Sequence, residues 1–111
     1  MPTFITRGRY TAESIKSLVG RPENREVAVS ALVESSGCRL RDFYVTLGRY
    51  DFLTIVEAPS AKEASAFILA AAASGSVTDI ETIEAFTGAE AKQVFTEAGK
   101  VAGKYRPPGK A

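Results

Sequence analysis

Alternating apolar and polar positions predict four β-strands in this chain. The expected strands cover residues 3–10, 38–47, 52–58 and 77–86, and they are rich in β-branched and aromatic residues. Glycine is typical of the turns that end such strands, and Gly37, Gly48 and Gly75 lie at three of the strand ends. The pattern therefore indicates a β-rich core with short connections.

Helical spacing of apolar residues fills the longer intervals between these strands. Two pieces, residues 11–19 and 22–36, predict one kinked crossover whose second part begins at Pro22. After the third strand, Ser60 and Glu63 have the spacing of a capping box. The core stripe of the helix that follows is expected from Ala64, Phe67, Ile68 and Ala71.

A last helix is expected over residues 88–103, with Thr87 and Glu90 as a second capping box. Residues 104–111, which include Pro107 and Pro108, predict a flexible tail. We therefore expect a single domain over residues 1–103. One face of the last helix should carry Ala91, Val94, Phe95, Ala98, Val101 and Ala102.

The order of elements, β-α-β-β-α-β plus one helix, is that of the ferredoxin-like α+β fold. This fold has a four-stranded antiparallel sheet with two helices on one face. If a two-residue type II′ loop beginning at Gly48 joins the middle strands, both faces of the sheet carry large apolar groups. One face would hold Phe43, Val45, Leu47, Phe52, Thr54 and Val56, and the other Leu40, Asp42, Tyr44, Thr46, Leu53, Ile55 and Glu57.

Two helices can cover one of these faces. We therefore expect the other face to meet an identical sheet from a second subunit, so that the protein is a homodimer or a higher oligomer. A monomer with such an exposed patch would be prone to aggregate.

Composition fits a globular protein and excludes several kinds of chemistry. The 111 residues are 45% hydrophobic, and their net charge of +1 gives no support to a nucleic-acid partner. The absence of histidine excludes Ser-His-Asp triads, histidine metal sites and His-ligated haem, so we expect no metal and no cofactor. We expect a cytoplasmic protein without a membrane partner, because long apolar segments are absent and Cys38 is the single cysteine.

The run LGRYD at residues 47–51 leads directly into the apolar strand FLTIVEAP and follows PTFI and RYT near the N-terminus. Together these stretches resemble the GYD domain family, which is named for this Gly, Tyr and Asp. The resemblance extends from residue 1 to around residue 90. It implies a dimeric α/β-barrel, in which ferredoxin-like sheets pair, and an undefined biochemical role.

The same hairpin, together with GSVTDIET at residues 75–82, is also similar to the ligand-binding domain of the Lrp/AsnC regulators. That resemblance implies an effector amino acid bound between subunits near the turn. No helix-turn-helix precedes the first strand in this sequence, which argues against transcriptional activity.

The turn supplies three candidate ligand-binding residues, Gly48, Tyr50 and Asp51. Turn geometry explains Gly48, but a hairpin needs neither of the other two, and aspartate is disfavoured in strands. Asp51 and Tyr50 either bind a ligand or have structural roles. In the structural alternative, Asp51 caps backbone amides and Tyr50 packs at a subunit boundary.

Three further candidates come from the neighbouring strands. Arg7 and Arg9 share one face of the first strand and could hold a carboxylate or phosphate, or lie in water at the strand margin. Tyr44 of the second strand completes the set.

Three classes of function fit these observations. We favour a small-molecule binding module whose pocket lies near the turn or at the subunit interface. A cofactor-independent oxygenase or isomerase is an alternative, and without histidine its proton-transfer group would be Asp42, Asp51, Glu57, Glu81 or a tyrosine. A structural or interaction subunit without a ligand is the third.

Overall fold

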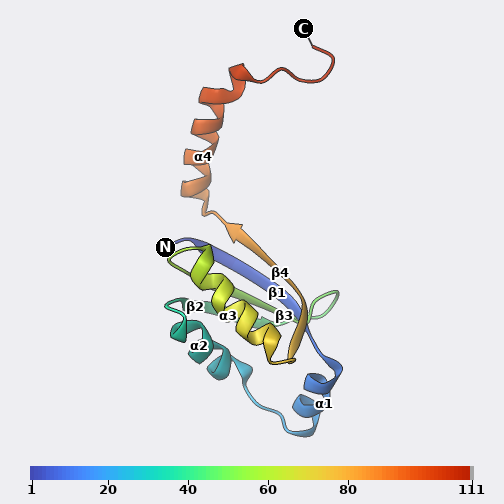
Figure 1. Ribbon diagram of the computed structural model, residues 1–111. Coiled ribbons are helices and arrows are strands. Elements are labelled where there is room, and N and C mark those ends of the chain that lie inside the picture. The colour runs from blue at the N-terminus through green and yellow to red at the C-terminus, as the bar shows by residue number, and fades with distance from the viewer. Residues whose placement is uncertain (111) are drawn as a thin grey trace.

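The computed structural model describes residues 1–110 and shows a four-stranded antiparallel sheet. The strand order is β2-β3-β1-β4, so the two strands of the hairpin lie on one side of the N-terminal strand. Helices α2 and α3 lie on the same face of the sheet (Figure 1). The strands are β1 (Thr3–Tyr10), β2 (Arg39–Val45), β3 (Phe52–Glu57) and β4 (Val77–Ala85). This α+β arrangement confirms the predicted order of elements.

Helices occupy each interval in which the sequence predicted them. They are α1 (Ala12–Gly20), α2 (Arg25–Ser35), α3 (Ala61–Ala73), α4 (Gly88–Val101) and the short 3₁₀ helix η1 (Ala102–Lys104). Among residues 1–110, no helix has the length and apolar character needed to cross a membrane.

Side-chain caps fix where the helices begin. Asn24 caps α2 by accepting a hydrogen bond from the Glu26 amide at 3.0 Å, so the prediction that this helix begins at Pro22 is wrong. The capping box at α4 is confirmed, because Thr87 and Glu90 exchange bonds of 2.8 and 3.1 Å between side chain and backbone. These bonds hold the pKa of the Glu90 carboxyl below its usual value.

The hairpin between β2 and β3 differs from the predicted two-residue turn. Val45 pairs with Phe52, so the loop contains six residues, 46–51. The amide of Asp51 donates to the carbonyl of Gly8 in β1 at 2.8 Å, which ties the loop to a third strand instead of closing it as a tight turn. Gly48 has a φ of 116°, a conformation that favours glycine.

A shift in register corrects the predicted position of Leu40. The pairing of β2 with β3 changes between Leu40 and Asp42, as expected of a β-bulge. Leu40 therefore lies opposite Val56 and packs against the core under the helices. Leu47 lies outside the strand and is exposed.

The buried core lies between the helices and one end of the sheet. Val33 of α2 and Val56 of β3 are completely buried at its centre. Two residues of the predicted stripe of α3, Ala64 and Phe67, belong to this core, and Ile68 packs against it. The remaining buried members of the cluster are Phe4, Cys38 and Ala58.

The opposite face of the sheet, which we call the open face, presents three rows of side chains. Cross-strand pairing gives one row of Tyr44, Leu53, Arg7 and Glu81, a second of Asp42, Ile55, Ile5 and Ile83, and a third of Arg39, Glu57, Thr3 and Ala85. Three isoleucines therefore lie side by side in the middle of this face. Ile83, on the outer strand β4, is 48% exposed.

Helix α4 extends away from the sheet and from the other helices (Figure 1). None of its residues is buried, and the apolar residues Val94, Phe95 and Val101 of its predicted stripe are exposed. The projecting helix makes the molecule elongated. The radius of gyration of the whole molecule is 18.1 Å, whereas a compact chain of this length has about 13 Å.

Close packing of Phe52 against β1 requires glycine at position 8. A Cβ atom added to Gly8 would lie 2.6 Å from Cζ of the Phe52 ring. We therefore expect Gly8→Ala to lower the free energy of unfolding by about 1–3 kcal/mol, as overpacking does elsewhere. Gly99→Ala in α4 is the control, because the added methyl group meets no atom there and alanine favours a helix. Chemical denaturation measures both, and equal stability of the two variants would contradict the packing of Phe52 on Gly8.

Candidate functional site

Arg7, Tyr50 and Glu81 form a cluster at one end of the open face. The Arg7 guanidinium is hydrogen-bonded to the Glu81 carboxylate and lies over the Tyr50 ring, 4.7 Å from its centroid. The Tyr50 hydroxyl donates to Glu81 at 3.3 Å. The hydrogen bond to Arg7 holds the pKa of the Glu81 carboxyl below its usual value. The cluster combines a cation, an anion and a phenol on a partly exposed surface.

Asp51 turns away from this cluster and caps the backbone. Its carboxylate accepts a hydrogen bond from the Tyr10 amide at 2.9 Å, and its own amide donates to Gly8 at 2.8 Å. Its carbonyl accepts from the Thr46 amide at 2.7 Å. Asp51 thus extends the pairing of β1 with β3 beyond Phe52. Its carboxylate caps a backbone amide, as in the structural alternative, whereas the packing of Tyr50 at a subunit boundary stays a prediction.

The other candidates from the sequence lie around the cluster. Tyr44 belongs to the same row of the open face as Arg7, with Leu53 between them. Arg9 is exposed and lies beyond a register shift between β1 and β4, where Asp79 has a positive φ of 51°. The structure therefore brings Arg7 and Tyr50 together and adds Glu81, which the sequence indicated as a possible proton-transfer group.

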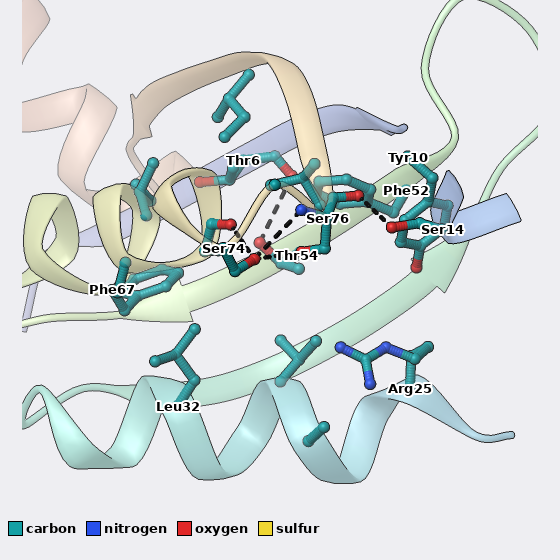
Figure 2. A pocket seen from close by; sticks show the side chains of 18 of the residues that line it. Thr6, Tyr10, Ser14, Arg25, Leu32, Phe52, Thr54, Phe67, Ser74 and Ser76 are labelled. Carbon is teal, nitrogen blue, oxygen red and sulfur yellow. Dashed lines mark hydrogen bonds between the residues drawn. The ribbon is translucent and has the colours of Figure 1, made fainter. Parts of the chain in front are cut away.

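A cavity of about 600 Å³ lies on the other side of the sheet, between its helix-covered face and helices α1, α2 and α3. Figure 2 shows Phe52 and Thr54 of β3 on one side of this space and Leu32 and Arg25 of α2 on the other. Its lining includes β1 positions near the loop end of the sheet, whereas the buried core lies toward the opposite end.

Hydroxyl groups from several elements contribute to the lining of this cavity. The lining residue Thr6 has its Oγ1 atom 3.0 Å from that of Thr82, which lies outside the lining, and the Thr54 hydroxyl donates to the Thr6 carbonyl at 3.5 Å. At the end of α3, the Ser74 and Ser76 hydroxyls are 2.8 Å apart (Figure 2). Thr6 and Thr54 are buried. These threonines occupy inward positions at which apolar residues are usual, and this is the signal that could have revealed the cavity from the sequence.

Tyr10 connects the loop with the cavity. Its amide is held by Asp51, and its ring lines the cavity with a centroid 5.3 Å from that of Phe52. Burial raises the pKa of the Tyr10 phenol above its usual value. A single hydrogen bond therefore connects Asp51 to Tyr10, a residue that lines the cavity.

These features define a ferredoxin-like α+β domain with an uncovered sheet face and a cavity beneath its helices. The sequence model of the GYD domain family matches residues 4–95, and the chain belongs to this family. The match includes the loop with Gly48, Tyr50 and Asp51 and the first half of α4.

Known proteins resemble the chain in sequence and in fold. A protein of Thermus thermophilus, described as a glutamine synthetase and cystathionine beta-lyase binding protein, is 36% identical over 90 residues, 81% of this chain and 94% of that protein. A solved structure, also from Thermus thermophilus, has a TM-score of 0.52 at 19% identity and covers 79% of this chain and 96% of its own. A hypothetical protein from Pyrococcus horikoshii has a TM-score of 0.47 at 21% identity, with 78% and 92% covered.

The cap formed by Asp51 predicts a graded response to substitution. Asp51→Ala leaves the Tyr10 amide without its acceptor and should lower the free energy of unfolding by about 1–2 kcal/mol, whereas Asp51→Asn keeps an acceptor oxygen and should lose less than half of that. Urea denaturation measures both variants. The cap would be contradicted if alanine and asparagine had equal effects or if neither changed stability.

Proposed function

We propose that this GYD-domain protein is a self-associating module that binds other proteins. The observation that carries this proposal is the apolar surface that the chain leaves uncovered on the open face and on α4. Ile5, Ile55 and Ile83 are adjacent across three strands, and Val94 and Phe95 are exposed on the helix. Exposed apolar residues that gather in a patch with a polar rim are typical of protein contact sites.

A second copy of the chain is the proposed partner of the open face. Two such faces can pack about a twofold axis, so that each row of isoleucines meets its equivalent. Most charged residues of the face then lie in the marginal rows, and Asp42 lies at the end of the middle row, on the edge strand β2. This is the homodimer with facing sheets that the two-sided apolar hairpin predicted.

The open face alone is smaller than a stable dimer interface, so we propose that α4 contributes to the same dimer. Four strands about 4.8 Å apart and three rows about 7 Å apart make a patch of roughly 400 Å². Stable interfaces bury about 800 Å² on each partner. The stripe of α4, with Val94, Phe95 and Val101, offers the missing area if the helix packs on the second copy.

Binding to metabolic enzymes is proposed from the related protein. The Thermus relative is described as binding glutamine synthetase and cystathionine beta-lyase, and the alignment with this chain covers nearly all of it. We infer that the dimer formed by this chain contacts an enzyme of the same kind.

Small-molecule binding beside the β2–β3 loop is the second candidate function. It is favoured by the Arg7, Tyr50 and Glu81 cluster, which would lie at the border of the proposed dimer interface. A ligand with both a carboxylate and an amine, such as an amino acid, would complement the two charges.

Self-association can be tested at Ile83. Ile83→Glu places a charge in the middle row of the open face, and because the side chain is half exposed the subunit should still fold. Val27→Glu is the control, since Val27 is 71% exposed on α2 on the other side of the sheet. At micromolar concentration, light scattering should give a dimer for the parent and for Val27→Glu and a monomer for Ile83→Glu. A monomeric parent, or a dimeric Ile83→Glu, would contradict the proposal.

Enzyme binding can be tested with purified glutamine synthetase and cystathionine β-lyase from the organism that makes this protein. Isothermal titration calorimetry should show saturable binding of the parent to at least one of the two enzymes. Binding by the Ile83→Glu variant should be at least tenfold weaker, because a dimer offers two copies of each contact. If the parent binds neither enzyme, the proposed partner class is wrong even when the dimer forms.

A further inference from the structure

We propose that the cavity beneath the helices is a binding site for a neutral aromatic molecule that carries hydroxyl or carbonyl groups. The site lies on the opposite face of the sheet from the proposed dimer contact and is separate from the cluster around Arg7. It would therefore give the protein a ligand in addition to its protein partners.

Small side chains of the helices leave the cavity open. Ala28 of α2 and Ala70 and Ala71 of α3 line it at positions where leucine would fill the space. At the other end of the sheet, Val33 and Phe4 belong to the ordinary close-packed core. The resulting volume of about 600 Å³ lies within the roughly 300–1,000 Å³ of typical small-molecule sites.

Aromatic rings and hydroxyls determine what the inner walls can bind. Tyr10, Phe43, Phe52 and Phe67 contribute four rings to the lining. Flat apolar surfaces of this kind favour an aromatic ligand, which can stack against them or meet their edges. The hydroxyl groups around the rings can donate and accept, so they suit ligand hydroxyl or carbonyl groups.

The distribution of charge favours a neutral ligand. Charged residues enter the lining at three positions, and two of these, Glu13 and Glu23, are exposed. The third, Arg25, pairs with Glu23 at 3.5 Å, so its charge is already compensated. The threonines and phenylalanines deeper in the cavity are uncharged, and a ligand charge placed among them would lose its hydration without gaining a partner.

Binding of 2-naphthol tests the site, because this probe is a neutral fused aromatic with one hydroxyl. We expect saturable binding to the full-length protein in a fluorescence titration, with 2-naphthoate, the anion of similar shape, at least tenfold weaker. Ala71→Phe should fill the cavity and weaken 2-naphthol binding at least tenfold. Ala66→Phe is the matched control on the exposed side of α3 and should bind like the parent.

Thr54→Val provides a second variant in case the larger side chain disturbs the fold. It keeps the shape and removes one hydroxyl, so 2-naphthol should bind about threefold to tenfold more weakly. The Ile83→Glu variant should bind 2-naphthol like the parent, which separates this site from the self-association surface. The proposal is overturned if 2-naphthol does not bind saturably, if the naphthoate binds equally well, or if neither cavity variant weakens binding.

Discussion

A sheet has two faces, and this chain supplies helices for one of them. Helices α2 and α3 cover the face that carries Phe4 and Val56, and the row of isoleucines lies on the other (Figure 1). Burying apolar surface contributes about 25 cal/mol per Å², so a face of this kind is stabilised by any matching surface. The proposed dimer follows from this imbalance, and so does the proposed packing of α4, whose apolar residues Val94, Phe95 and Val101 are exposed.

The helix-covered face of the sheet is closely packed at one end and has the cavity at the other. Leucine, valine and phenylalanine fill the space beneath the helices near Val33, whereas alanine and serine leave a cavity near Tyr10. Gly8 lets the Phe52 ring lie across β1, and Asp51 fixes the Tyr10 backbone next to it. The loop that carries the family's Gly, Tyr and Asp therefore contacts both faces of the sheet, with Tyr50 over Arg7 on one side and Asp51 holding Tyr10 toward the other.

The regular parts of the fold could be predicted from the sequence, because they depend on local periodicity. Alternation identified the four strands, and Thr87 with Glu90 marked the start of α4. The six-residue loop and the bulge near Leu40 could not be found in this way, because hydrogen bonds to β1 and β3 determine them. The pairing of Arg7 with Glu81 and the lining of the cavity depend on strand register and on residues distant in the sequence, so the pattern alone did not reveal them.

The proposed contact between open faces can be observed directly by isotope-filtered NMR on an equal mixture of labelled and unlabelled chains. If two sheets face each other, intermolecular NOEs should join the methyl groups of Ile5, Ile55 and Ile83 of one chain to the same row of the other. Methyl groups of the buried Val33 and of the exposed Val27, on the helix side, should show none. A dimer whose intermolecular NOEs came from α2 instead of the isoleucines would contradict the pairing of the sheets.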